Sequence, residues 1–412
     1  MANAHTVGDL RARGWQRKSV KQELRDNLIA RLRKGDSFLP GIVGYDDTVV
    51  PQIENAILAG QDMIFLGERG QAKTRIARLL VGLLDEEIPV LAGCEINDDP
   101  LAPICAGCRQ RLAEQGDKAA IEWIPRDRRY GEKLATPDIT IADLIGEVDP
   151  IKVAEGRYLG DELTIHYGLL PRTHRGIFSL NELPDLAERI QVGLLNIMEE
   201  RDVQIRGYKV RLPLTVFGDG VATQCPDYMK QIVAELTHLA RQSSDVSQRS
   251  GVSVRVSICN YENILASALK RAIRLREEIA VPRVSDLGAL AASTVGKIEL
   301  ESVGDGNEEK LLGRLVQKAV HNVFGRRFGQ PELDEVVAAF KAGASLHVSD
   351  AMPSDEYVKQ LGQFPALRGA VVKLGATEAA AVASAVEFVL EGLHLAKKLN
   401  KDVQPGRSRY RS

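Results

Sequence analysis

The sequence predicts an α/β protein in which helices sandwich a parallel sheet, followed by a region that is helical to the end of the chain. Three observations lead to this expectation. Strand-like and helix-like segments alternate over residues 41–217, a pattern typical of a parallel sheet. From about residue 227, apolar residues recur mostly at helical spacing, as in the ranges 260–276, 310–324 and 379–395. The 412 residues leave room for two or three domains.

The composition is that of an ordinary globular protein. Hydrophobic residues make up 44% of the chain, charged residues 27%, and the net charge of −2 gives no general attraction to nucleic acid or to a membrane surface. The beginning of the chain has no apolar signal region, and no apolar run is long enough to cross a bilayer. The 5 cysteines form no regular framework, which favours a reducing compartment. We therefore expect a cytoplasmic protein with neither a membrane nor a nucleic-acid partner.

The first 40 residues form a basic N-terminal arm that is rich in arginine and lysine. Residues 20–32 can fold as an amphipathic helix through Leu24, Leu28 and Leu32. Two interpretations are open, a solvated leader helix and an arm that docks on a partner. Because charge runs usually face water, we favour the solvated helix.

A glycine-containing loop separates an apolar run from a helical pattern. Residues 62–66 fit a buried parallel strand, and residues 75–84 carry apolar side chains at helical spacing. Between them lie Gly67, Glu68, Arg69, Gly70, Gln71, Ala72, Lys73 and Thr74. These residues match the pattern G-x-x-x-x-G-K-[ST] except at Ala72, where the second glycine is expected. In this pattern backbone amides hold nucleotide phosphates, the lysine reaches the β- and γ-phosphates, and the hydroxyl binds Mg²⁺.

Ala72 is expected to weaken phosphate binding. Glycine at this place lets the backbone approach a phosphate closely and adopt dihedral angles that a Cβ resists. A methyl group would crowd the phosphate or shift the loop. The sequence therefore predicts that Ala72→Gly tightens nucleotide affinity.

An acidic residue further along the chain supplies the second half of a nucleotide site. Residues 176–182 form an apolar strand that ends in Asn181 and Glu182. Glu182 can orient or deprotonate the attacking water, and the Asn181 side-chain oxygen can accept a hydrogen bond from a metal-bound water. The alternative is a strand that runs into an ordinary surface turn.

Five segments in order then resemble one family, the AAA+ ATPases of the magnesium-chelatase I and MoxR type. Gly41–Gly44 resembles the segment on the adenine side of the nucleotide, and Leu144–Pro150 resembles the L-x-G-x-x-D insert. Gly168–Ile177 resembles the run before the acidic motif, and Glu199–Gly207 resembles a β-hairpin insertion. Gly251–Arg255 resembles the sensor-2 motif G-x-S-x-R. Together they cover about residues 38–275.

The resemblance implies a P-loop NTPase fold, ATP and Mg²⁺ as cofactors, and roles for individual residues. Val43 would lie at the adenine, Lys73 at the β- and γ-phosphates, Thr74 and Asn181 at the metal, and Arg255 at the γ-phosphate. It also implies a core domain over 41–217, a helical lid over 218–290 and a helical extension over 291–412. Members of the family form rings and remodel, or load metal into, partner proteins that often carry a von Willebrand A domain.

One part of the family pattern is missing after residue 217. The chain has no Asn-Pro dipeptide for the sensor-1 position and no recognisable finger arginine after Phe217. Family sheets run in the order 5-1-4-3-2, so loss of the fifth strand would leave residues 62–66 at an edge. The alternation of apolar residues over 252–258 could supply a substitute strand, but the order of motifs favours the helical lid there. An alternative function follows: a degenerate subunit that hydrolyses ATP poorly or not at all and acts through interactions.

Several smaller features have two interpretations each. Cys94, Cys105 and Cys108 could bind a metal, but no fourth ligand is evident nearby, so we favour ordinary thiols. His166 and His174 are expected to be structural rather than ligands. The aromatic and basic residues over 123–130 are expected to form a solvated insert, and the basic tail from Lys397 is expected to fray.

Overall fold

A computed structural model describes most of the chain. The described residues are 4–68, 70–155, 162–200, 202–205, 208–211, 221–247, 251–295, 297–299, 307–404 and 406–412. The chain divides into two compact units. Unit 1 comprises residues 1–30, 37–43 and 64–218, and unit 2 comprises residues 31–36, 44–63 and 219–412. The architecture is mixed α/β, as the sequence predicts, but its sheets are small.

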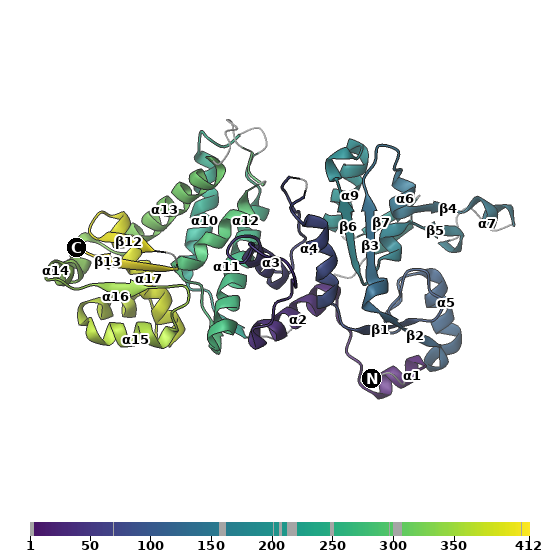
Figure 1. Cartoon of the computed structure of the whole chain (residues 1–412), viewed down its shortest axis with the longest axis horizontal. Coiled ribbons are helices and arrows are strands. Elements are labelled where there is room, and N and C mark those ends of the chain that lie inside the picture. The colour runs from purple at the N-terminus through teal and green to yellow at the C-terminus, as the bar shows by residue number, and fades with distance from the viewer. Residues whose placement is uncertain are drawn as a thin grey trace. The chain divides into compact units, whose positions relative to one another are not determined.

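Unit 1 mixes short strands with helices (Figure 1). Its helices are α1 (Val7–Ala12), most of α2 (Val20–Lys34), α4 (Lys73–Leu79), α5 (Ala106–Gln115), α6 (Ile141–Ile145), α7 (Pro150–Ala154), α8 (Leu169–Arg172) and α9 (Glu188–Glu200), with short 3₁₀ turns η1 (Leu80–Leu83), η2 (Gly116–Lys118), η3 (Arg126–Arg129), η4 (Glu162–Thr164) and η5 (Leu183–Asp185). Its strands are β1 (Glu87–Leu91), β2 (Ile121–Pro125), β3 (Tyr130–Leu134), β4 (Gly146–Val148), β5 (Ile165–Tyr167), β6 (Ile177–Asn181), β7 (Asp202–Ile205) and β8 (Tyr208–Arg211).

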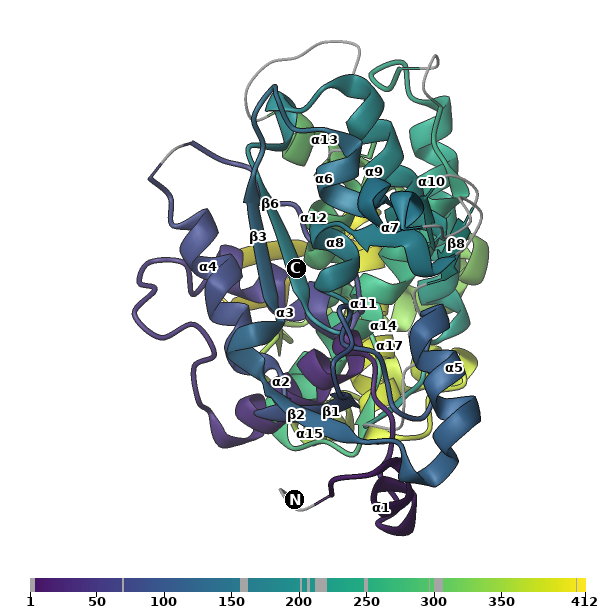
Figure 2. The ribbon, with the colours of Figure 1, turned by 90° about the vertical axis from the view of Figure 1, so that its right-hand side faces the viewer.

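The described strands of unit 1 pair two by two. β3 and β6 are parallel and run side by side in Figure 2, with Tyr130 opposite Ile177 and Leu134 opposite Asn181. The pairs β1–β2, β4–β5 and β7–β8 are antiparallel. The strand predicted over 176–182 is thus confirmed as β6. A hairpin is formed by β7 and β8, but it begins at Asp202 and ends at Arg211, later than the predicted range 199–207, because Glu199 and Glu200 belong to α9. The predicted strand over 212–217 lies outside the described residues.

The strand predicted over residues 62–66 is wrong. These residues form neither helix nor strand, and Ile64 and Leu66 are 66% and 81% exposed. A strand is stabilised by ladder hydrogen bonds to its neighbours, and the family order would place it between strands 5 and 4. No described strand pairs with this segment. An apolar run is therefore irregular where the sequence suggests a central strand.

The N-terminal helices pack into the protein, so the expectation of a solvated leader helix is wrong. Val7 and Leu10 of α1 and Leu28 of α2 are almost completely buried. The predicted amphipathic helix is present as α2. Its Glu23 is also buried and pairs with Arg129 at the end of η3. The basic residues of this region are therefore distributed around a packed apolar face.

Unit 2 is mainly helical and has its own core (Figure 1). It contains α3 (Val49–Leu58), α10 (Asp227–Gln242), α11 (Val254–Leu275), α12 (Leu290–Thr294), α13 (Asn307–Arg327), α14 (Asp334–Lys341), α15 (Ser354–Gln363), α16 (Arg368–Lys373) and α17 (Ala379–Leu395), with 3₁₀ turns η6 (Val284–Ala289), η7 (Gln330–Leu333) and η8 (Pro365–Leu367). Its strands are β9 (Ala222–Thr223), β10 (Ile279–Ala280), β11 (Leu346–Val348), β12 (Asn400–Gln404) and β13 (Arg407–Arg411).

The helices expected from apolar spacing over 260–276, 310–324 and 379–395 are confirmed as α11, α13 and α17. In α17 thirteen of seventeen residues are buried, because neighbouring helices surround it. The substitute strand considered over 252–258 is wrong, since α11 begins at Val254 with Ser253 as its N-cap. Among the described residues, no helix combines the length and apolar character that crossing a bilayer requires.

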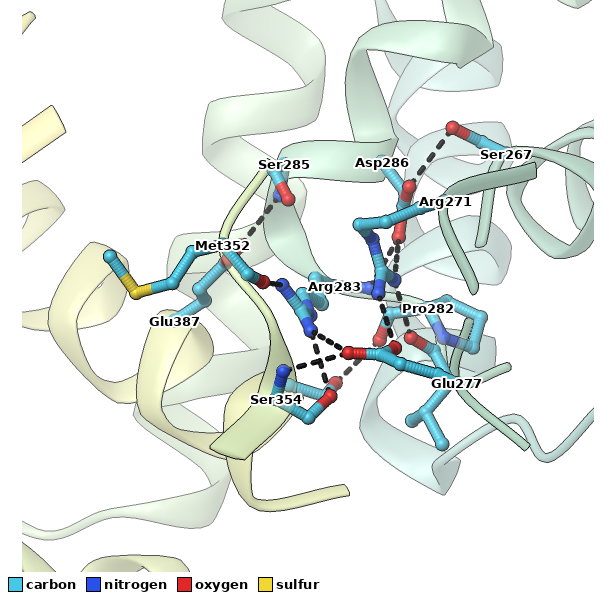
Figure 3. Close-up of polar contacts among 12 residues, drawn as sticks. Ser267, Arg271, Glu277, Pro282, Arg283, Ser285, Asp286, Met352, Ser354 and Glu387 are labelled. Atoms are coloured by element: carbon cyan, nitrogen blue, oxygen red, sulfur yellow. Dashed lines mark hydrogen bonds and ion pairs between the residues drawn. The ribbon is translucent and has the colours of Figure 1, made fainter. Parts of the chain in front are cut away.

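A buried polar network joins distant segments of unit 2 (Figure 3). The Arg283 guanidinium is fully buried and donates to the Met352 carbonyl at 2.8 Å and to the Ser354 hydroxyl at 2.9 Å. Arg271 pairs with Asp286 at 2.8 Å. These bonds attach the segment after β10 to the start of α15, so the network fixes the packing of helices far apart in sequence.

The C-terminal tail is ordered, and the expectation that it frays is wrong. β13 is the middle strand of an antiparallel sheet, between β11 and β12. Tyr410 on β13 is 2% exposed, while Arg409 and Arg411 on either side of it are exposed. This alternation gives the strand one buried face and one basic face.

Candidate functional site

The predicted phosphate loop closes around its own lysine. The Lys73 ammonium donates to the carbonyl oxygens of Gly67 at 2.5 Å and Glu68 at 2.6 Å. Lys73 and Thr74 form the first turn of α4, and Gly70 and Gln71 are exposed. The Lys73 ammonium is therefore held by backbone carbonyl oxygens of the loop itself. The helix predicted over 75–84 is confirmed as α4 continued by η1.

Three described residues of the loop have a positive φ. Gly67 has a φ of 148°, Gly70 of 85° and Ala72 of 58°. The φ of Gly67 is one that residues with a Cβ rarely adopt, so this turn favours glycine, and a Cβ here would also displace the Gln71 side chain. Ala72 adopts the left-handed region despite its methyl group, which costs about 1–2 kcal/mol for a residue other than glycine. The left-handed φ of Ala72 therefore gives a physical reason for the expectation that a Cβ is unfavourable at this position.

Glu132 links the helix behind the loop to the strand that carries the acidic motif. Its carboxylate accepts hydrogen bonds from Arg78 Nε at 2.7 Å and Nη2 at 2.9 Å, and from Asn181 Nδ2 at 2.8 Å. Arg78 lies on α4, Glu132 on β3 and Asn181 at the end of β6. The bonds from Arg78 lower the pKa of Glu132. Three elements that the sequence separates are thereby brought together at one carboxylate.

The acidic motif ends in an exposed carboxylate. Glu182 follows β6 with a φ of 57°, again in the left-handed region, and its side chain is exposed. Asn181 uses its amide nitrogen for Glu132, so its carbonyl oxygen can accept a further bond. The two residues therefore present one negative and one neutral acceptor at the end of the strand.

Other predicted site residues are not brought to this place by the described contacts. Val43 lies in a loop of unit 1 and is 88% exposed. Arg255 lies in the first turn of α11 in unit 2. Its role, like the adenine-side role of Val43, stays a prediction. Arg69 lies outside the described residues.

The expected solvated insert over 123–130 is wrong. Trp123 on β2 packs edge-on against Trp15, with ring centroids 5.5 Å apart, and donates to the Ala4 carbonyl. Arg129 is fully buried.

The two histidines differ in environment. His174 is 9% exposed, and burial lowers its pKa to about 4, so it is neutral at neutral pH. His166 is exposed.

Sequence reasoning missed one residue beside the cysteines. The structure brings Cys94, Cys105 and Cys108 together with Asp98, and the four donor atoms lie within 4.8 Å of one another. Asp98 lies between Cys94 and Cys105 in the sequence, so a carboxylate as the fourth ligand was the signal that could have identified it. The expectation that no fourth ligand lies nearby is wrong.

The chain was compared with protein-family models, curated proteins and solved structures, and none of them matches it.

Proposed function

We propose that the chain binds ATP with Mg²⁺ at residues 67–74 and hydrolyses it, in the manner of AAA+ ATPases of the magnesium-chelatase I and MoxR type. The observation that carries the proposal is the Glu132 bridge. It joins α4, which begins with Lys73, to β6, which ends at Asn181 and Glu182. A phosphate-binding lysine and a water-orienting carboxylate must share one site, and this bridge ties together the elements that bear them.

The chemistry assigned to each residue follows from its atoms. Lys73 would exchange the carbonyl oxygens of Gly67 and Glu68 for the β- and γ-phosphate oxygens, which carry full negative charge. The Thr74 hydroxyl would ligate Mg²⁺, and the Asn181 carbonyl oxygen would accept a hydrogen bond from a water on the metal. Glu182 would orient the attacking water. Arg255 would reach the γ-phosphate from the helical lid.

The wider role rests on the family resemblance. A homo-oligomeric ring would use the nucleotide cycle to remodel a partner protein or to load metal into it. The partner would carry a von Willebrand A domain. Because the finger arginine is missing, we expect slow turnover, since such an arginine contributes about 10³–10⁵-fold to rate.

A second candidate function is a subunit that does not hydrolyse ATP and acts by interaction. One observation favours it: residues 62–66 form no strand, so the loop lacks the rigid support that a central strand would give. In addition, an amide stands at Asn181 where the family usually has a carboxylate.

Calorimetric titration with ATP and Mg²⁺ tests the proposal. We expect saturable binding that Lys73→Ala weakens about 10–100-fold, the value of a charge-assisted hydrogen bond. Lys118→Ala, at an exposed lysine of η2, is the matched control and should bind as the unmodified chain does. Equal affinity of the Lys73→Ala and Lys118→Ala variants would contradict the site.

Phosphate release separates the two functions. An ATPase should release phosphate slowly, and Glu182→Gln should abolish release while leaving binding unchanged. Binding without release in the unmodified chain would instead support the interaction subunit.

A further inference from the structure

Three thiols and a carboxylate from one stretch of unit 1 meet at a single point. Cys94 lies in the turn after β1, and Asp98 lies in the loop that follows. Cys105 is the N-cap of α5, and Cys108 is in the first turn of that helix. All pairs of their donor atoms are within 4.8 Å. A tetrahedral zinc ion with Zn–S bonds of about 2.3 Å separates its ligand atoms by about 3.8 Å, so the donor atoms already have nearly the spacing that the ion requires.

Backbone amides around the cluster donate hydrogen bonds to Cys94, Asp98 and Cys105. The amide of Cys108 donates to Cys105 Sγ at 3.3 Å, and the amide of Asp98 donates to Cys94 Sγ at 3.5 Å. The two Asp98 oxygens accept from the amides of Ile104 and Cys105, each at 3.0 Å. Such bonds orient ligands and stabilise thiolates. Each carboxylate oxygen retains a lone pair that can bind a metal.

The cluster places a buried carboxylate among three thiols. Asp98 is 0% exposed and Cys108 1% exposed. The two Asp98 oxygens accept from backbone amides, whereas the adjacent Asp99 pairs with Arg17 at 3.1 Å and Arg175 at 3.9 Å. A buried carboxylate needs compensating charge. A divalent cation bound by the same four side chains would supply it.

We propose that Cys94, Asp98, Cys105 and Cys108 bind one Zn²⁺ ion in a closed site that fixes the loop 92–104 against the start of α5. Sulfur ligands select a thiophilic ion over Mg²⁺ or Ca²⁺, and each thiol gives its proton to solvent as it binds. Four protein ligands would complete the tetrahedral shell and leave no position for a substrate, so the site is structural rather than catalytic. The inference does not depend on nucleotide binding.

Metal analysis of the purified full-length chain tests the proposal. After growth with added zinc we expect about one zinc ion per chain, and Cys108→Ser and Cys105→Ser should each lower the content at least about fivefold. Cys225→Ser and Cys259→Ser are the matched controls, because both cysteines lie in unit 2, and they should retain the metal. Iron in place of zinc, or less than about 0.1 metal ion per unmodified chain, would overturn the assignment.

A measurement on the unmodified chain removes the dependence on folding of the variants. The chain is stripped with a chelator under reducing conditions and titrated with Co²⁺. We expect sulfur-to-cobalt charge-transfer and visible d–d absorption that saturates at one equivalent and is reversed by Zn²⁺. Absence of these bands from a chain with free thiols, or a disulfide among the three cysteines of the freshly purified chain, would overturn the proposal.

Discussion

Arg129 and Glu23 form a bidentate ion pair in the interior of unit 1. Both guanidinium-to-carboxylate bonds are 2.9 Å long, and the side chains are 0% and 2% exposed. Arg129 also donates to the Arg175 carbonyl, and Glu23 accepts the amide of Asp85. One pair therefore connects α2, the segment before β1, the turn η3 and the segment before β6. Loss of one partner would leave the other charged and buried.

Glu23→Gln should lower the free energy of unfolding of unit 1 by about 3–5 kcal/mol, the usual effect of removing one member of a buried ion pair. Fluorescence is a suitable measurement because both tryptophans, Trp15 and Trp123, belong to unit 1. Asp117→Asn removes a pair with Arg11 whose side chains are more than half exposed, and this control should change stability by less than about 1 kcal/mol. Equal effects of the two substitutions would mean that the buried pair has no special role.

The helices of this protein were predictable because their signal is local. Apolar residues at helical spacing predicted α11, α13 and α17, and the amphipathic pattern predicted α2. The burial of α2 was not predictable, because the carboxylate of Glu23 packs against an arginine 106 positions away. Charged residues along a helix show that the helix can be exposed to water, but they do not show that it is exposed.

The strands were harder to predict because a strand depends on its partner. Residues 62–66 have the composition of a buried strand, yet the described structure offers them no neighbour. β13 has three arginines in five residues and is nevertheless the middle strand of a sheet. At the candidate site the sequence supplied Lys73, Asn181 and Glu182. Glu132 and Asp98 escaped notice because neither belongs to a motif, and only folding brings each to its partners.

Ala72→Gly should relieve the left-handed strain of the phosphate loop. We expect unit 1 to gain about 1 kcal/mol of stability and nucleotide affinity to increase, because glycine adopts this conformation without cost. Arg276→Gly is a matched control: Arg276 has the same φ of 58° but lies in unit 2. It should stabilise the chain without changing affinity. Unchanged ATP affinity on calorimetry after Ala72→Gly would remove Ala72 as a cause of weak binding.

Asn181→Asp should destabilise unit 1 in the absence of nucleotide. The substitution replaces the amide that donates to Glu132 with a second carboxylate, which repels it, at a cost of about 1–2 kcal/mol. Glu132→Gln in the same chain should restore most of the loss, since an amide can then donate to the new carboxylate. Unfolding of the two single variants and the double variant, followed by tryptophan fluorescence, gives the interaction free energy between positions 132 and 181. Additive effects would show that the Glu132 bridge does not operate.

His174 should make unit 1 less stable in acid. Its folded-state pKa of about 4 lies below the value of about 6.5 for an unfolded histidine, so the unfolded chain binds more protons between these limits. The contribution of neutral His174 to the free energy of unfolding is fully present above pH 6.5. It is lost as the pH decreases toward 4, which lowers the free energy of unfolding by up to about 3 kcal/mol. Urea unfolding at pH 7 and pH 5 should therefore show a smaller loss in His174→Gln than in the unmodified chain. His166→Gln, at an exposed histidine, should lose as much as the unmodified chain.

Tyr410→Phe should destabilise unit 2, because the tail is part of its core. The Tyr410 hydroxyl donates to the Glu391 carboxylate at 2.5 Å, and Lys401 pairs with the same carboxylate at 2.7 Å. Removing the hydroxyl leaves Glu391, which is itself buried, with one partner fewer. We expect a loss of about 1–3 kcal/mol, the cost of a buried acceptor left unsatisfied.

Circular dichroism at helical wavelengths follows this loss, since unit 2 is mainly helical. Arg407→Ala, at an exposed position on the same strand, is the control and should change stability by less than about 0.5 kcal/mol. Hydrogen exchange gives a second readout: the amides of β11 and β12 should exchange faster in Tyr410→Phe, because β13 lies between them. If Tyr410→Phe and Arg407→Ala unfold at the same urea concentration and exchange alike, the Tyr410 hydroxyl does not stabilise the packing of β13.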